Sequence, residues 1–456
     1  AKPEPGSEAT YTILSSMTDV RFPDQGWKRR VINRADEYPA VFTGWKIGVS
    51  DNGSWYATIR DASTVYRYRP TDSHQPLRDG QWHLLGFTYD EDISEIRFYY
   101  DGEQKAVYYI PDLKPWSAAD TLVIGNSADS EHDYSIKERD SFFGRIDDVS
   151  LYKGVLDAKS IRSYYGQYRP TPVKPETSMR PDSLKITSFN IWHAGKERGK
   201  EAGLANTIAL LKQQDPDVVT LVETYGAAEE IAGALGFQFY LISSNLAIFS
   251  RYPIEETYRL FKPFNSGGAL VRIPDGRQIR VFAIWLYHLP DYKSILASRQ
   301  ISIARYLTEE NKTRGMQMQS ILNEMKPFIA VADSIPITMA GDFNSGSHLD
   351  WTAAMADRHY GYVLPWPVSS ALASAGFKDS YRFIHPDPAT HPGTTISITP
   401  ESAGTIKDRI DFIYFKGKML RPVYTNTIYN HSISFPSDHA GVSTSFIWKN
   451  DGNPIH

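Results

Sequence analysis

The chain has 456 residues, of which 41% are hydrophobic and 22% are charged. Domains average on the order of 150 residues, so we expect two or three domains with packed cores, and wholesale disorder is excluded. Lys and Arg number 49 against 53 Asp and Glu, which gives a net charge of -4. Non-specific binding to phosphate backbones needs a basic surplus, so a dedicated nucleic-acid binder is disfavoured.

The sequence contains no cysteine, which excludes disulfides, thiolate nucleophiles and zinc-thiolate sites. Its strongest apolar run, at 281–287, is much shorter than the roughly 20 residues of a transmembrane helix and predicts a buried strand. We therefore expect no transmembrane segment. Residues 1–7 lack the basic and apolar segments of a signal peptide, so we expect no signal peptide in this chain. A start from which processing has removed a signal peptide would look the same.

Short strands dominate the first part of the chain. Residues 81–89, 95–100 and 121–124 are aromatic or β-branched, and Asp-Gly and Gly-Asn turn signals separate them. This spacing predicts an antiparallel β-sandwich. A helix is expected only at 158–165.

A proline-rich segment then interrupts the pattern. Four prolines lie between 170 and 181 in a polar stretch, where they block helix interiors and sheet ladders. Up to Arg180 the chain has 23 Lys and Arg against 27 Asp and Glu, whereas the remainder is balanced at 26 of each. We therefore expect a domain at 1–168, a linker at 169–183 and a second domain at 184–456.

The second domain alternates between strand and helix patterns, which predicts a layered α/β fold. The expected strands are at 184–190, 217–222, 281–287, 337–340, 409–415 and 443–448, and the expected helices are at 203–214, 295–307 and 316–325.

Acidic, amide and imidazole side chains recur at the ends of these strands, where ligand sites of layered α/β folds gather. They are Asn190, Glu223, His288, Asp342, Asn344, Asp438 and His439. Asp411 lies inside an apolar strand instead, where a carboxylate needs a histidine or a metal as partner. With no cysteine, this oxygen-rich set favours Mg²⁺, Mn²⁺ or Ca²⁺. It predicts metal-assisted hydrolysis of a phosphate ester.

The ordered set of motifs resembles the endonuclease/exonuclease/phosphatase superfamily. The motifs are Thr-Ser-Phe-Asn ending at 190, Leu-Val-Glu ending at 223, Gly-Asp-Phe-Asn at 341–344, Arg-Ile-Asp at 409–411 and Ser-Asp-His at 437–439. The segment 393–396 is similar to the family's Gly-x-Thr-Trp, with isoleucine in place of tryptophan. The resemblance covers 184–448 and implies the family's four-layer α/β sandwich.

The resemblance also implies roles for single residues. Glu223 would be the main metal carboxylate, with Asn190 and Asp438 beside it. Asp342 would orient or deprotonate the attacking water, and Asn344 would hold the phosphate.

For the histidines, the resemblance implies that Asp411 orients His439, which contacts the phosphoryl oxygens. His288 is similar to the histidine that assists the leaving group in the deoxyribonuclease I and sphingomyelinase branches. Abasic-site nucleases place other residues there, which disfavours a repair nuclease.

Four further side chains lie on loops just after these strands, and we expect them to contact substrate: His193, Lys196, Arg198 and His348. For Lys196 and Arg198, plain exposure on a polar loop is an equal alternative. Paired glutamates are instead expected on solvated faces, at 229 and 230, 255 and 256, and 309 and 310.

The first domain resembles laminin G-like, concanavalin A-like domains, which implies an all-β jelly-roll sandwich. The resemblance is carried by Asp-Gly-Gln-Trp-His at 79–83 and by the segments 96–102, 122–126 and 143–152. Such domains bind glycans or act as spacers. Trp82 and Phe143 are expected in the core, and Trp45, Trp55 and Trp116 are better candidates for sugar stacking, although a structural role is favoured for each.

Together the two resemblances predict a Mg²⁺-dependent phosphoesterase, with Mn²⁺ or Ca²⁺ as alternatives. Its expected substrate is a phosphorylated glycan or lipid head group, and carbohydrate is a candidate ligand of the first domain. By analogy we expect an extracytoplasmic bacterial enzyme, whether secreted, periplasmic or at the cell surface. A secreted nuclease of the deoxyribonuclease I type and an inactive glycan-binding surface protein are the alternatives.

Overall fold

The computed structural model describes residues 2–3, 11–19, 42–61, 64–113, 122–125, 142–168, 182–398, 406–429 and 435–449. It divides into two compact units. The first comprises residues 1–174 with 232–236, and the second comprises 175–231 with 237–456. The expected linker lies mostly outside the described residues, so its boundaries stay a prediction.

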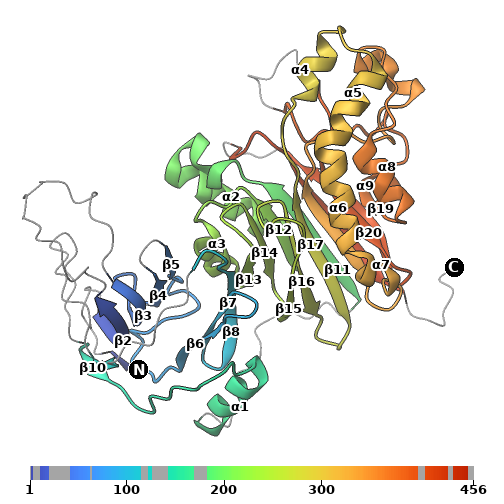
Figure 1. Cartoon of the computed structure of the whole chain (residues 1–456). Coiled ribbons are helices and arrows are strands. Elements are labelled where there is room, and N and C mark those ends of the chain that lie inside the picture. The colour runs from blue at the N-terminus through green and yellow to red at the C-terminus, as the bar shows by residue number, and fades with distance from the viewer. Residues whose placement is uncertain are drawn as a thin grey trace, which may run out of the picture. The chain divides into compact units, whose positions relative to one another are not determined.

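The first unit is an antiparallel β-sandwich of the concanavalin A-like type (Figure 1). One sheet has the order β5-β4-β3-β2-β9: Val65–Tyr68, Trp55–Arg60, Phe42–Val49, Tyr11–Asp19 and Val123–Ile124. Facing it are β6 (Leu85–Asp90), β7 (Glu95–Tyr100) and β8 (Glu103–Tyr109), paired in that order. β1 (Lys2–Pro3) pairs with β10 (Gly144–Arg145), and α1 spans Ala158–Tyr168.

Aromatic rings hold the two faces of this sandwich together. Tyr68 of β5 stacks on Phe98 of β7 with ring centroids 4.5 Å apart, and Trp55 lies edge-on to Tyr68 at 5.2 Å. Trp55 is fully buried and Trp45 is 8% exposed, so neither offers a sugar platform.

The expectation that Trp82 and Phe143 are core residues is wrong. Their side chains are 41% and 65% exposed. Trp82 precedes β6 rather than lying within it, so the inward-outward alternation of a strand does not apply. Trp116 lies outside the described residues.

The second unit is built on two mixed sheets. The first has the order β21-β22-β11-β12-β14-β13: Leu420–Ile428, Gly441–Trp448, Ser183–Asn190, Val218–Val222, Leu246–Ser250 and Gln238–Leu241. The second has the order β15-β16-β17-β18-β20-β19: Ile254–Arg259, Ser266–Arg272, Gln278–Trp285, Ile337–Asp342, Asp411–Lys416 and Lys378–Asp379. Parallel pairing occurs between β11 and β12 and between β17 and β18.

Burial along the central strands shows that both faces of each sheet are covered. Every residue of β12, β14 and β18 is buried, as in strands between two layers. Side chains of α6 (Met316–Glu324) and α8 (Pro367–Ser374) pack with β17, β18 and β20 in one core cluster. With α2 (Lys200–Gln214) beside the first sheet, the unit is the expected four-layer α/β sandwich (Figure 1).

The helix expected at 295–307 is two helices. α4 spans Tyr292–Ala297 and α5 spans Ile303–Glu310. Arg299 between them has a left-handed backbone (φ 54), and the side chain of Ser302 caps α5. The other helices of this unit are α3 (Ala228–Leu235), α7 (Lys326–Ala330) and α9 (Ser380–Ile384). No helix among the described residues is long and apolar enough to cross a bilayer.

Candidate active site

The two sheets bring their polar strand ends together. Asn190 ends β11, and Glu223 follows β12, its parallel neighbour. In the other sheet Asp342 ends β18 and lies opposite Asp411, the first residue of the antiparallel strand β20. Antiparallel pairing therefore explains how residues 69 positions apart become neighbours.

Asn190 connects the two sheets. Its amide donates to Oε1 of Glu223 and to Oδ2 of Asp342, both at 3.2 Å. Its Oδ1 accepts the backbone N–H of Trp192 at 3.0 Å, and its backbone carbonyl accepts the hydroxyl of Ser437 at 2.7 Å. Only 2% of Asn190 is exposed, so these bonds are shielded from water.

His439 lies among three carboxylates. Its Nδ1 donates to Oδ2 of Asp411 at 2.9 Å, and its Nε2 is 4.0 Å from both Asp342 and Asp438. Burial by itself lowers the pKa of this imidazole, but the charges of Asp411 and Asp342 outweigh burial and raise the pKa to about 10. His439 is therefore an imidazolium at neutral pH, with Nε2–H facing the acidic group.

Asp342 is buried and held by three donors. The backbone N–H of Asn344 (2.9 Å), the side-chain amide of Asn344 (3.1 Å) and the amide of Asn190 all donate to it. Burial raises the pKa of Asp342 to about 7, against the lowering influence of His439. A carboxylate with a pKa near neutrality is suited to accept a proton from water.

Glu223 lies on a strained stretch of backbone. It has φ 63, and its Oε2 accepts the backbone N–H of His193 at 2.9 Å. Trp192, His193 and Ala194 are also left-handed, a conformation that costs energy in residues with a Cβ. Gly195, the next residue, lies directly against Gly203. A Cβ added at Gly203 would be 1.7 Å from the carbonyl oxygen of Gly195, so this close contact requires glycine at 203.

The ligand chemistry fits a hard divalent cation. The described residues contain one buried group with ligand atoms within 4.8 Å of one another, made by Asp342, Asp411 and His439. Oδ1 of Asp411 and Oδ1 of Asp438 are buried and have no hydrogen-bond partner among the described residues. Buried carboxylate oxygens without a donor need a cation or water, so a metal could be held here. A protonated His439 has no free ring nitrogen, which leaves the ligation to carboxylate and amide oxygens.

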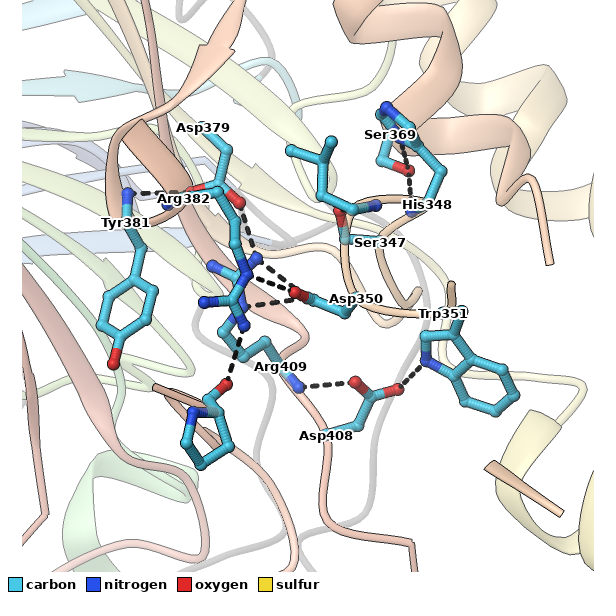
Figure 2. Close-up of polar contacts among 12 residues, drawn as sticks. Ser347, His348, Asp350, Trp351, Ser369, Asp379, Tyr381, Arg382, Asp408 and Arg409 are labelled. Carbon is cyan, nitrogen blue, oxygen red and sulfur yellow. Dashed lines mark hydrogen bonds and ion pairs between the residues drawn. The ribbon is translucent and has the colours of Figure 1, made fainter. Parts of the chain in front are cut away.

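The four residues expected to contact substrate differ in the groups that they bind. The ring of His193 is within 3.5 Å of Glu223, so the structure brings it to the site. Lys196 donates to the carbonyl of Tyr225, two residues after Glu223, and Arg198 stacks on Trp192. Nδ1 of His348 lies 2.8 Å from the hydroxyl of Ser369 on α8 (Figure 2).

His288 is exposed on the segment after β17, and among the described residues it makes no hydrogen bond with Asp342 or His439. The same segment nevertheless reaches the site, because the amide of Asn344 donates to the carbonyl of Leu286 at 2.9 Å.

An ion-pair network beside the site was not expected from the sequence. Asp350 binds Arg382 and Arg409, and Arg409 also binds Asp379 at 2.7 Å (Figure 2). All four side chains are buried. Arg409 is only two residues before Asp411, so the network fixes the start of β20. The Arg-Ile-Asp motif at 409–411 was the sequence signal that could have indicated a role for Arg409.

Thr395 is a second supporting residue. Its hydroxyl accepts the backbone N–H groups of Ile410 and Asp411 at 3.0 and 3.1 Å. The segment 393–396 thus contacts the catalytic strand through Thr395, while Ile396, which stands where the family has tryptophan, is buried.

Comparisons with known proteins agree with this architecture. Residues 20–162 match the model of the concanavalin A-like lectin/glucanases superfamily, and residues 187–439 match that of the endonuclease/exonuclease/phosphatase family. An uncharacterized Caenorhabditis elegans protein is 30% identical over 300 residues, which are 58% of this chain and 91% of that protein.

Three solved structures are among those that match the second unit. Humanized D. rerio TDP2 is 19% identical, with 58% of this chain and 98% of that chain covered and a TM-score of 0.42. The human Nocturnin catalytic domain is 15% identical, with 60% and 96% covered and a TM-score of 0.41. An endonuclease/exonuclease/phosphatase protein from Beutenbergia cavernae is 17% identical, with 59% and 72% covered and a TM-score of 0.39. The second family model alone spans more than half of the sequence, and the chain belongs to the endonuclease/exonuclease/phosphatase family.

Proposed function

We propose that this chain is a Mg²⁺-dependent hydrolase of phosphate esters carried on carbohydrate or lipid head groups. Members of its family hydrolyse phosphate esters, generally with a divalent metal. The observation that carries the proposal is the position of the His439 imidazole, which is bonded to Asp411 at 2.9 Å and lies 4.0 Å from Asp342, beside the Asn190–Glu223 pair. This combines a proton acceptor with a cationic donor in one buried group.

Glu223, Asn190 and Asp438 are the residues proposed to hold the cation. They offer carboxylate and amide oxygens, the ligands preferred by Mg²⁺, although Mn²⁺ and Ca²⁺ suit the same set. When bound, the cation offsets the negative charge on the phosphoryl oxygens. The backbone N–H of His193 donates to Oε2 of Glu223, which favours the present orientation of the carboxylate.

The chain's own groups then move the proton and bind the phosphate. Asp342 takes a proton from the attacking water, while Nε2–H of His439 donates to a phosphoryl oxygen. The side-chain amide of Asn344 donates to Asp342 at 3.1 Å. When substrate binds, this amide donates to a second phosphoryl oxygen instead. His288 protonates the leaving oxygen, and Lys196, Arg198 and His348 contact the outer part of the substrate.

The substrate class rests on charge and on the partner unit. The second part of the chain is electrically balanced, which does not favour a polyanion such as DNA. The concanavalin A-like unit is a candidate carbohydrate binder. We propose that it forms a domain at 1–168, which a linker at 169–183 joins to a catalytic domain at 184–456. Lectin-like domains are often extracellular, which supports the proposed extracytoplasmic location. The proposed bacterial origin rests only on analogy with bacterial surface enzymes that carry such a sandwich.

A substrate panel tests the proposal with the full chain. Phosphorylated sugars, sphingomyelin and plasmid DNA are each assayed with Mg²⁺ and with EDTA, using His439→Ala and an exposed control, His391→Ala. We expect metal-dependent turnover of a sugar or lipid ester that His439→Ala loses. Plasmid nicking with steep salt dependence would instead indicate a nuclease, and glycan binding without turnover of any ester would indicate an inactive binding protein.

A further inference from the structure

Glu310 and Arg314 form a buried ion pair one helical turn apart. Both side chains are 0% exposed. Nε of Arg314 donates to both carboxylate oxygens, at 2.9 and 3.0 Å, and Nη2 makes a further short contact to Oε2. The expectation that residue 310 lies on a solvated face is therefore wrong, whereas the side chain of its neighbour Glu309 is 46% exposed and pairs with Lys312.

The remaining donors of Arg314 bind the segment that carries His288. Nη1 donates to the carbonyl of Tyr287 at 3.0 Å, and Nη2 donates to the carbonyl of Pro290 at 3.1 Å. The backbone is thus bonded on both sides of His288. Gln317 accepts the backbone N–H of Tyr287 at 2.9 Å, which adds a third bond to the same segment.

Glu310 binds the loop that follows Asn344. Its Oε1 accepts the hydroxyl of Ser345 at 2.8 Å, and its Oε2 accepts that of Tyr306 at 3.1 Å. One buried ion pair therefore bonds two neighbouring segments, residues 287–290 after β17 and residue 345 after β18.

We infer that Glu310 and Arg314 are positioning residues. They hold the segment of His288 next to the loop that follows Asn344, so that His288 can protonate the leaving group. This inference rests on the proposed phosphoesterase activity. The guanidinium of Arg314 presents planar, preorganised donors. Because it binds two separated carbonyls of one segment, it fixes the orientation of that segment as well as its position. A proton donor on a loop needs such support, because a displacement of about 1 Å can cost on the order of 100-fold in rate.

Arg314→Lys tests the inference, because it keeps the buried charge and removes the two-carbonyl contact. Its matched control is Arg305→Lys on the exposed face of α5. Glu310→Gln and its exposed neighbour Glu309→Gln form a second pair. Turnover is measured on aryl phosphate esters whose phenol leaving groups differ in pKa, with Mg²⁺ at saturation, and circular dichroism checks that each variant is folded.

We expect Arg314→Lys to lower kcat on the phenyl ester by about tenfold or more and to change kcat on the 4-nitrophenyl ester little, because a good leaving group needs no acid. His288→Ala should give the same pattern, and the His288→Ala/Arg314→Lys double variant should be no worse than His288→Ala. An equal loss on both esters, or losses that multiply in the double variant, would overturn the positioning role.

The test separates this inference from the proposed function. If wild type fails to hydrolyse every ester, the phosphoesterase proposal fails, and the inference with it. If His288→Ala shows no dependence on the leaving group, the assigned role of His288 is wrong. If His288→Ala shows that dependence and folded Arg314→Lys does not, only the positioning inference is overturned.

Discussion

Nδ1 of His439 donates to Oδ2 of Asp411 across 2.9 Å, inside a site where both side chains are almost fully buried. This bond fixes which ring nitrogen faces the reacting group. It also keeps the ring protonated, because Asp411 makes the largest contribution that raises the pKa of His439.

Asp411→Asn should lower kcat/KM by about 100-fold or more, since the neutral amide does not stabilise the imidazolium and can hold the ring in the other tautomer. Because the wild-type pKa is raised, the amide should lower it, so the alkaline limb of the pH profile should move to lower pH. Profiles of kcat/KM at constant Mg²⁺ check this, with Asp357→Asn as an exposed control. An unshifted alkaline limb would contradict the role of Asp411.

Glu223→Gln should weaken cation binding while leaving the fold intact, because the amide keeps the size of the side chain and loses its charge. We expect the Mg²⁺ concentration for half-maximal activity to rise by more than about tenfold. Calorimetric titration with Mg²⁺ measures the same change without turnover. Glu201→Gln on the exposed side of α2 is the matched control, and an equal effect of both variants would contradict the assignment.

Two buried groups beside the ion-pair network should give opposite pH dependence to stability. Burial raises the pKa of Asp408 to about 7, so from about pH 4 to 7 the folded state retains a proton that the unfolded chain releases, and stability falls as pH rises. Burial lowers the pKa of His359 to about 4, so from about pH 4 to 6.5 the unfolded chain binds the extra proton, and stability increases with pH.

Each variant should therefore uncover the contribution of the other group. From pH 4.5 to 6.5, urea midpoints should rise more steeply for Asp408→Asn than for wild type, and His359→Phe should shift the slope in the opposite direction. Phenylalanine keeps the ring that stacks on Trp351 at 4.1 Å. Parallel slopes for the three proteins would show that neither group titrates as described.

Two tryptophans of the first unit should behave differently. Trp55→Ala should destabilise the sandwich by about 3–5 kcal/mol, because the ring is fully buried against Tyr68 and Phe98. Trp82→Ala removes a ring that is 41% exposed and should change stability little. If this unit binds glycans through Trp82, a glycan array should show reduced binding for Trp82→Ala with an unchanged unfolding midpoint. Unchanged binding would place the sugar contact elsewhere.

The sequence predicted the strand ends at Asn190, Glu223 and Asp342 because short motifs directly after apolar runs are local features. It did not distinguish Glu309 from Glu310, since adjacent helical residues differ only in the direction of their side chains. The spacing of Tyr306, Glu310 and Arg314, four residues apart on one helical face, was the signal that could have placed them together. The sequence also gave no sign that His348 bonds to Ser369, because the two residues lie 21 positions apart on separate segments.

The hydrogen bond from Asn190 to Asp342 has a consequence for assembly of the molecule. The two residues belong to different sheets, so neither sheet can form the site alone. If the chain is cut at the turn near Pro253, Asn190 and Glu223 lie on one fragment and Asp342, Asp411 and His439 lie on the other. Because β21 and β22 of the first sheet lie on the second fragment, recovery of activity on mixing would report both the pairing of β22 with β11 and the docking of the two sheets. The proposed activity would then serve as a split reporter.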